Sequence, residues 1–257
     1  MATKIIAIAN QKGGVGKTTT TINLGAYLAD MGRRVLIVDL DPQGNSSSGL
    51  SVDREAGGDL YDVLLDEMDA AEAVRPTGVK GLRVLPASPV LATAELELVG
   101  ETGREFKLRE ALRGLDYDFI LIDCPPSLGL LTVNGLAAAH DLIIPVQAEF
   151  YALEGLSQLV QTVQRVRKAL NPELGLMGVV VTMHTGRMTL SAQVHDEVKR
   201  HFPDKVFDTV IPRNVRLAEA PSFGQPIMQY DRWSKGAKSY KELAKEVMHR
   251  SQQRSSK

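Results

Sequence analysis

Short apolar runs that recur along the whole chain constrain the fold more than any other feature of the sequence. Most of them are continuous rather than alternating, which is the pattern of strands buried on both faces of a sheet. Helical segments lie between them, and an alternation of strand and helix predicts right-handed crossovers and a parallel sheet. The predicted strands are 4–9, 34–40, 82–87, 118–123, 141–147, 174–182 and 206–212.

The helical segments support a single α/β domain with a mostly parallel twisted sheet and helices on both faces. No linker divides the chain, and its 257 residues suit one large domain. We therefore expect one domain over 1–250 and a frayed polar tail over 251–257. The clearest predicted helices are 18–31, 105–115, 153–170, 189–201 and 237–250.

The segment NQKGGVGKTTT, at 10–20, matches a phosphate-binding loop with one departure from the usual pattern. Gly16, Lys17 and Thr18 form the expected G-K-[ST] ending, but glutamine replaces the first glycine and a second lysine, Lys12, follows it. A predicted strand precedes the loop and a helix follows, so backbone N–H groups and the helix dipole can bind phosphate. In such loops Lys17 reaches the β- and γ-phosphates and Thr18 binds Mg²⁺. The sequence predicts a P-loop NTPase.

Carboxylates lie at the C-terminal ends of two of the predicted strands. Asp123 ends the run FILID, the form of a second nucleotide motif in which a strand-end aspartate serves the magnesium shell. Asp39 and Asp41 are two residues apart, which predicts that they share one strand face near its C-terminal end. Ligands of open α/β sheets bind there, so one of the two is expected to position an attacking water. The alternative is that Asp41 only forms a turn before Pro42.

Charge is distributed unevenly along a chain whose net charge is only −1. Residues 1–150 carry an excess of eight acidic side chains, and residues 151–257 an excess of seven basic ones. Such asymmetry is compatible with a polyanion-binding face and also with a merely solvated surface. The single cysteine, Cys124, excludes an internal disulfide, and no apolar run approaches the ~18 residues of a membrane span. These features favour a cytoplasmic protein.

Together the segments KGGVGKTTT, VDLDPQGN, LIDCPPSLG, PVQAEFYALEGL and IPRNVRLAEAPSFG resemble the ParA/Soj family of chromosome and plasmid partition ATPases, from about Lys4 to about Val247. KGGVGK is that family's deviant Walker motif. The resemblance implies an ATPase that uses ATP and Mg²⁺ and forms a homodimer when ATP is bound. It further implies nonspecific binding of double-stranded DNA, association with the nucleoid, and slow hydrolysis stimulated by a ParB/Spo0J-type centromere-binding protein.

The resemblance also implies roles for individual residues. Lys12 would cross a dimer interface to the nucleotide of the other subunit, although a cis contact or a solvated lysine fits the sequence equally well. With Lys12 and Lys17, Asp41 would complete the catalytic groups by orienting the hydrolytic water, and Thr18 and Asp123 would serve the metal. The implied phosphate cradle and adenine loop consist of Lys12, Gly13, Gly14, Val15, Gly16, Lys17, Thr18, Thr19, Pro212, Arg213 and Asn214.

The basic half of the chain supplies the expected DNA contacts. The resemblance points to Arg187 and Arg216, and further basic residues follow near the C-terminus. Lys238, Lys241 and Lys245 are three and four residues apart and so line one helix face. Nonspecific binding needs phosphate contacts rather than base readers. The candidate DNA contacts are Arg187, Arg216, Lys235, Lys238 and Lys241, and the apolar stripe opposite them is Tyr240, Leu243, Ala244, Val247 and Met248.

Three other classes share parts of this pattern. A MinD-type membrane-positioning ATPase has the same loop but needs a C-terminal helix with large apolar residues facing lipid, and the ending EVMHRSQQRSSK is too polar for that. A nitrogenase iron protein needs two cysteines in each subunit. A metabolic kinase or ligase stays open, because no feature of the sequence excludes it.

Overall fold

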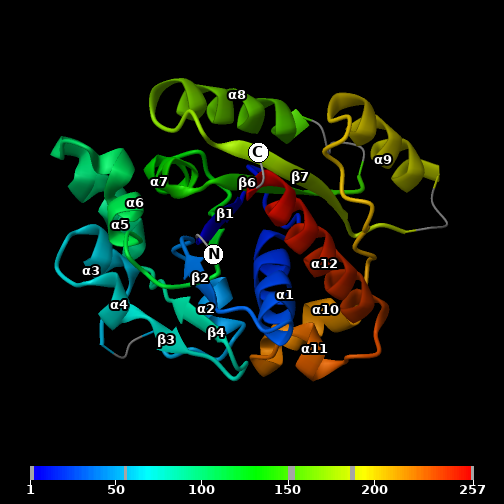
Figure 1. Cartoon of the computed structure of the whole chain (residues 1–257), viewed down its shortest axis with the longest axis horizontal. Coiled ribbons are helices and arrows are strands. Elements are labelled where there is room, and N and C mark those ends of the chain that lie inside the picture. Colours follow the sequence, from blue (N-terminus) through cyan, green and yellow to red (C-terminus); the bar gives the residue numbers. More distant parts are fainter. Residues whose placement is uncertain (1–2, 55–56, 150–153, 186–188, 256–257) are drawn as a thin grey trace.

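The computed structural model describes residues 3–54, 57–149, 154–185 and 189–255, and it centres on one seven-stranded sheet (Figure 1). The strand order is β3-β4-β2-β5-β1-β6-β7, and only β3 runs antiparallel to its neighbour. The mostly parallel sheet is therefore confirmed. The strands are β1 (Lys4–Ile8), β2 (Val35–Asp39), β3 (Arg75–Pro76), β4 (Leu82–Leu85), β5 (Phe119–Asp123), β6 (Asp141–Gln147) and β7 (Gly175–Thr182).

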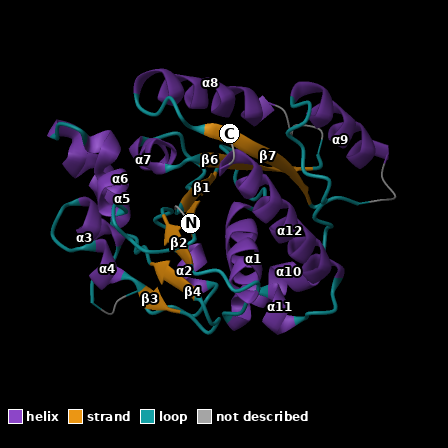
Figure 2. Cartoon of the chain, viewed as in Figure 1, coloured by secondary structure: helices purple, strands orange, loops and turns teal. Residues whose placement is uncertain are grey.

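Helices surround the sheet in Figure 2. Three short 3₁₀ turns, at Leu98–Gly100, Arg104–Phe106 and Ala220–Phe223, supplement them. The α-helices are α1 (Lys17–Asp30), α2 (Asn45–Ser48), α3 (Leu60–Leu64), α4 (Ala70–Ala73), α5 (Leu91–Glu97), α6 (Lys107–Ala111), α7 (Leu130–Ala138), α8 (Glu154–Ala169), α9 (Thr189–His201), α10 (Val215–Glu219), α11 (Ile227–Tyr230) and α12 (Lys235–Ser255).

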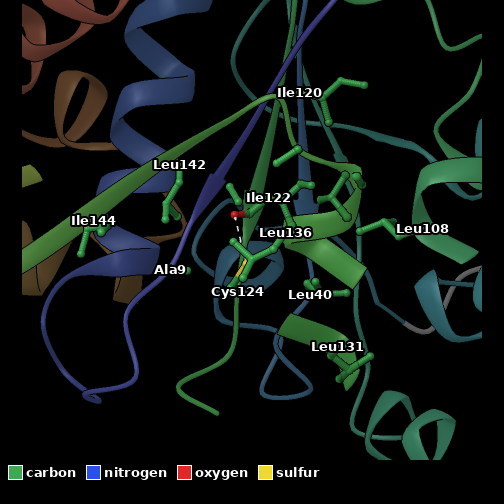
Figure 3. Packing of buried hydrophobic residues seen from close by; sticks show 14 of the residues in the cluster. Ala9, Leu40, Leu108, Ile120, Ile122, Cys124, Leu131, Leu136, Leu142 and Ile144 are labelled. Carbon is green, nitrogen blue, oxygen red and sulfur yellow. Dashed lines mark hydrogen bonds between the residues drawn. The ribbon is translucent and has the colours of Figure 1, made fainter. Parts of the chain in front are cut away.

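Two hydrophobic cores lie on opposite faces of the sheet. Successive side chains of a strand point to opposite faces, and Ile6 and Ile8 of β1 join one core while Ala7 joins the other. The core with Ala7 packs under α3–α9, and Figure 3 shows part of it around Cys124. The core with Ile6 packs under α1 and α10–α12. Helices on both faces are thus confirmed.

Helices α1 and α12 pack against one another on the face that holds Ile6 (Figure 1). The hydroxyl groups of Thr20 on α1 and Tyr240 on α12 lie 3.1 Å apart and share a buried hydrogen bond. The predicted apolar stripe of α12 docks on the core as expected, with Tyr240, Leu243, Ala244 and Val247 buried and Met248 partly buried. The C-terminal helix is therefore tied directly to the helix that follows the nucleotide loop.

The predicted seventh strand, 206–212, is wrong. This segment follows the outer edge of β7 without a continuous ladder. Val179 of β7 bridges Val206, the Ile211 N–H donates to the Val181 carbonyl oxygen at 2.8 Å, and His184, beyond the end of β7, bridges Pro212. Between them the N–H groups of Asp208 and Thr209 donate to the carboxylate of Glu246 on α12, at 3.0 and 2.8 Å. Because a side chain takes these donors, a continuous ladder does not form.

Two element boundaries also differ from the sequence predictions. The predicted helix 105–115 is a 3₁₀ turn followed by the five-residue α6. The last helix continues to Ser255, so residues 251–255 are helical rather than frayed. A domain limit at residue 250 stays a prediction. Within the described ranges, no helix combines the length and apolar character needed to cross a bilayer.

Candidate nucleotide-binding site

The loop between β1 and α1 ends in a helix N-terminus suited to an anion. Gly16 precedes α1 with φ +89°, and Gly14 has φ +73°, both in the left-handed region that favours glycine. Among the described residues, no side chain caps this helix. Its first N–H groups therefore remain available, together with the positive end of the helix dipole, for a phosphate group.

Contacts to strands β6 and β7 hold the loop in place. Asn10 donates from Nδ2 to the carbonyl oxygen of Pro145 at 2.7 Å, and the Lys12 N–H donates to Asn10 Oδ1 at 3.1 Å. From the other side Thr182, the last residue of β7, donates its hydroxyl to the carbonyl oxygen of Val15 at 2.8 Å. The loop is thus anchored before any ligand binds.

Lys17 is buried at the base of the loop. Its Nζ lies 3.4 Å from the carbonyl oxygen of Lys12. Burial lowers the pKa of Lys17, although the negative charges of Asp123 and Asp41 oppose that shift. A buried ammonium that keeps only part of its hydrogen-bonding capacity fits an anionic ligand, which would restore favourable charge pairing.

Two carboxylates meet at the C-terminal edge of the sheet, as the sequence predicted. Asp39 ends β2 and Asp123 ends β5, and they are register partners. Burial raises the pKa of both groups above the ordinary range for aspartate, and the proximity of Asp123 adds to the shift at Asp39. Hydrogen bonds from Ser46 and Thr18 oppose the shift at Asp123. A cation is therefore the ligand that this pair of carboxylates favours.

Helix α2 lies against these carboxylates. Ser46 donates its hydroxyl to Asp123 Oδ2 at 2.7 Å. Ser47 donates both its hydroxyl and its N–H to Asp39 Oδ2, at 2.7 and 2.8 Å. The other oxygen of Asp39 is buried without a hydrogen-bond partner among the described residues. Since a buried unpaired oxygen is costly, this atom favours a further ligand at the site.

The position of Asp41 corrects the sequence prediction. Strand β2 ends at Asp39, so Asp41 lies beyond the strand rather than on its face. Its side chain accepts the Gln43 N–H at 3.0 Å, and its backbone oxygen accepts the Gly44 N–H at 2.8 Å. Asp41 therefore does form a turn. It also lies close enough to Lys17 and Asp123 to act on their pKa values, so it belongs to the same site.

A small pocket of about 180 Å³ opens beside the loop. The predicted adenine loop, Pro212, Arg213 and Asn214, forms one wall of it. Gly16, Thr19, Thr182 and Tyr240 also line it. The pocket thus joins the phosphate loop to the predicted base-binding residues.

Lys12 makes a contact within its own chain. Its Nζ lies 3.7 Å from Glu149 Oε2, and the guanidinium of Arg213 lies 3.4 Å from Glu149 Oε1. Glu149 follows β6 and also accepts a hydrogen bond from Gln147. One carboxylate therefore holds the extra lysine of the loop and an arginine of the base pocket together. This ion pair is the state of Lys12 in the single chain, and its contact with a nucleotide, in cis or in trans, stays a prediction.

The predicted DNA contacts gather partly at α10 and α12. Arg216 is paired with Glu219 at 2.9 Å and lies 3.7 Å from Asp231. Lys235, Lys238 and Lys241 are exposed on α12. Arg187 lies outside the described residues.

Sequence reasoning missed Ser46, Ser47, Thr182 and Glu149. The serine run in NSSSG, directly after the acidic turn, is a signal that could have indicated the first two. The other two come from positions more than 130 residues after the loop, and only the sheet order brings them to it. Within the described ranges, clusters of three or more histidine, cysteine or acidic metal ligands are absent. A Mg²⁺ site does not need such a cluster, because this ion commonly binds one or two carboxylates and keeps several waters.

Comparisons with known proteins agree with this geometry. A family model described as an AAA domain matches residues 3–176. The sporulation initiation inhibitor protein Soj of Bacillus subtilis is 56% identical over 247 residues, which cover 95% of this chain and 98% of Soj. The chromosome-partitioning ATPase Soj of Thermus thermophilus is 56% identical over 248 residues, covering 96% of each. The chain belongs to the ParA/Soj family of chromosome-partitioning ATPases.

Solved structures that carry other names share this fold. A structure described as cobyrinic acid a,c-diamide synthase from Mycobacterium smegmatis with bound ADP and magnesium has a TM-score of 0.84 and 41% identity, covering 95% of this chain and 93% of that one. The septum site-determining protein MinD of Pyrococcus horikoshii, complexed with Mg-ADP, has a TM-score of 0.79 and 30% identity, covering 95% and 96%. The P-loop ATPase fold is thus common to this chain and to proteins of different names.

Proposed function

We propose that this chain is an ATP-dependent switch for chromosome or plasmid segregation. In the proposed cycle an ATP-bound homodimer binds double-stranded DNA without sequence preference, and hydrolysis releases it. The observation that carries the proposal is the phosphate loop, anchored at both ends and facing strand-end carboxylates, in a chain of the ParA/Soj family.

The residues of the site fit ATP and Mg²⁺. The loop from Lys12 to Thr19 would hold the phosphates through its N–H groups and Lys17, and the pocket at Pro212–Asn214 would take the base. Thr18 and Asp123, which lie close enough for the Thr18 hydroxyl to lower the pKa of Asp123, would hold the metal. When bound, Mg²⁺ neutralises negative charge on phosphate oxygens. Ser46 would keep the Asp123 carboxylate in its orientation.

Asp41 is the proposed residue for orienting the hydrolytic water. Its backbone is fixed by the turn to Gly44, and its carboxylate lies near Lys17 and Asp123 without belonging to the metal pair. A carboxylate held there can accept a hydrogen bond from water and align it. Lys17 would stabilise the negative charge on the phosphate that this water attacks.

Dimerisation is the step proposed for Lys12. In the isolated chain this lysine pairs with Glu149 at 3.7 Å and is about one-third exposed. Such a half-exposed pair is worth roughly 0–1 kcal/mol, so a stronger partner can displace it. A phosphate group of the other subunit's nucleotide is such a partner. Dimerisation would then depend on ATP.

DNA binding is proposed for the basic half of the chain. Two subunits would present two copies of the basic surface, and affinity rises steeply with the number of phosphate contacts. We assign the contacts to Arg187, Arg216, Lys235, Lys238 and Lys241. On this proposal the protein is cytoplasmic and nucleoid-associated, and a ParB-type centromere-binding partner triggers hydrolysis.

Two other functions receive less support. A MinD-type membrane role needs an apolar helix face toward lipid, whereas the apolar stripe of α12 is buried against α1 and the sheet. A ligase role rests on the likeness to the M. smegmatis structure, which is 41% identical, whereas the Soj proteins are 56% identical. A DNA-dependent change in ATPase rate separates partition from ligation.

The test measures DNA binding with ATP, with ADP and with a non-hydrolysable ATP analogue at several salt concentrations. We expect tight binding with ATP and its analogue, weak binding with ADP, and a slope near −0.9 per phosphate contact. The Arg187→Glu and Arg216→Glu variants should both lose DNA binding and keep ATP-dependent dimerisation. Binding by both variants equal to the parent at ~0.1 M salt would place the DNA surface elsewhere.

A further inference from the structure

Trp233 is the single tryptophan of the chain and stands on the surface. The residue is 74% exposed and lies in the turn between α11 and α12. An indole ring offers a large apolar surface, and tryptophan is enriched at interfaces, so a ring exposed to this degree is suited to a contact with another molecule.

Hydrogen bonds hold the turn that carries Trp233. Asp231 Oδ1 accepts the N–H groups of Trp233 and Ser234, at 3.2 and 3.1 Å. Ser234 Oγ then accepts the Ala237 N–H at 3.1 Å and caps the start of α12. The ring is thus presented from a backbone that is fixed before a ligand arrives, which lowers the entropy cost of binding.

Cations lie around the ring. The Arg232 guanidinium is 5.0 Å from the ring centroid, in cation–π range. Lys235 follows on the exposed side of α12, and Arg216 joins the same corner because its Nε lies 3.7 Å from Asp231 Oδ2. A single carboxylate therefore ties the arginine proposed to contact DNA to the turn that presents the tryptophan.

The acidic groups of this corner are already engaged. Asp231 is used by the turn and by Arg216, and Glu219 accepts from Arg216 at 2.9 Å and from the Tyr230 hydroxyl at 3.0 Å. The exposed charges nearest the ring along the chain, Arg232 and Lys235, are positive. The corner thus combines an aromatic face with flanking positive charge, which is complementary to the sugar and phosphate surfaces of DNA.

We propose that Trp233 is a DNA-contacting residue that packs its indole ring against the sugar and groove surface of duplex DNA while Arg232 and Lys235 pair with the phosphates on either side. This inference rests on the proposed DNA-binding function and adds to it an apolar contact that charge alone does not supply. A lipid surface fits less well, because Tyr240, Leu243 and Val247 of the adjoining helix are buried and leave no apolar stripe for a bilayer.

The emission of Trp233 provides the direct test, because no second tryptophan contributes to it. The full-length protein is titrated with a random-sequence duplex in the presence of a non-hydrolysable ATP analogue. We expect the emission to be quenched with the same midpoint as binding measured by an independent method. The analogue alone should leave most of the emission unchanged.

Variants separate the ring from the charges. Trp233→Leu should weaken duplex binding about fivefold with an unchanged salt slope, because no phosphate contact is lost. Trp233→Phe should weaken duplex binding less than Trp233→Leu does. Arg232→Gln should instead reduce the salt slope by about 0.9. Leu96→Ala, at a position 76% exposed on the distant α5, is the matched control and should bind like the parent.

Each of the following outcomes overturns the inference. Duplex binding by Trp233→Leu equal to the parent, or an emission that DNA does not change, removes the ring from the DNA surface. A full emission change with the ATP analogue alone assigns the ring to the dimer interface. A change in Trp233 emission caused by vesicles of anionic phospholipid, without DNA, assigns the ring to a membrane contact. If the parent binds DNA and Arg216→Glu does not, the proposed function survives any of these. A parent that binds no DNA overturns both.

Discussion

Asn214 hydrogen-bonds the backbone of Arg216, its Oδ1 accepting the Arg216 N–H at 2.8 Å as the N-cap of α10. Asn214 also lines the pocket beside the phosphate loop. One side chain therefore touches both the proposed base site and the helix that carries a proposed DNA contact. A change in the nucleotide pocket can reach α10 through this single residue.

Replacing Asn214 should affect both sites together. Asn214→Ala removes the cap, which costs about 1 kcal/mol of local stability, and should weaken nucleotide and DNA binding in parallel. Asn214→Ser keeps a capping oxygen and should retain most of the DNA binding. Fluorescent nucleotide titration and DNA binding with ATP measure the two effects. Weakened nucleotide binding with normal DNA affinity in Asn214→Ala would separate the two sites.

Thr182 should act as a positioning residue for the phosphate loop. Thr182→Val keeps the shape of the side chain but removes the hydrogen bond to the Val15 carbonyl. Because such a bond contributes about 1 kcal/mol, the variant should bind ATP about five- to tenfold more weakly. Calorimetric titration with ATP checks this, and circular dichroism verifies the fold. Thr93→Val on α5, far from the loop, serves as the control.

The two lysines of the loop should have separable roles. Lys17→Ala should abolish nucleotide binding, whereas Lys12→Ala should bind ATP as a folded monomer. Light scattering with ATP reports the oligomeric state, and equilibrium binding reports the nucleotide. An ATP-dependent dimer of Lys12→Ala would remove the proposed contact in trans.

The pair between Lys12 and Glu149 should restrain dimerisation. Glu149→Gln frees Lys12 and Arg213 from their shared carboxylate. Since half-exposed pairs contribute less than about 1 kcal/mol, dimerisation should strengthen only about two- to fivefold. Sedimentation across a protein concentration series with ATP measures it. Glu242→Gln, which breaks the surface pair with Lys245, is the charge-matched control. Weaker dimerisation of Glu149→Gln alone would mean that Glu149 itself serves the interface.

Asp41→Ala should bind ATP and hydrolyse it roughly a hundredfold more slowly, because the water loses its orienting carboxylate. The variant should accumulate as an ATP-bound dimer on DNA. Phosphate release and size-exclusion chromatography measure the two effects. Unchanged turnover would assign the water to another group.

Much of this architecture follows from pattern alone, because continuous apolar runs and a glycine-rich loop act locally. The segment 206–212 shows the limit, since its apolar composition suits a strand but Glu246, from a distant helix, takes two of its N–H groups. Asp41 shows a second limit of prediction from sequence. The two-residue period of a strand places Asp39 and Asp41 on one face only if the strand continues past Asp39, and it ends there. Glu149 could not be paired with Lys12 from sequence, because that contact depends on the neighbouring positions of β1 and β6.

The central place of β1 has a consequence during synthesis. Its neighbours in the sheet are β5 and β6, and Ile8 pairs with Asp123, 115 positions later. At about 5–20 residues per second, the ribosome needs roughly 6 to 23 seconds to supply that partner. Of the strands in this sheet, the one that leads into the nucleotide loop is thus the first to emerge and waits longest for a neighbour. A chaperone that binds apolar nascent segments would meet KIIAI before any other strand of this chain.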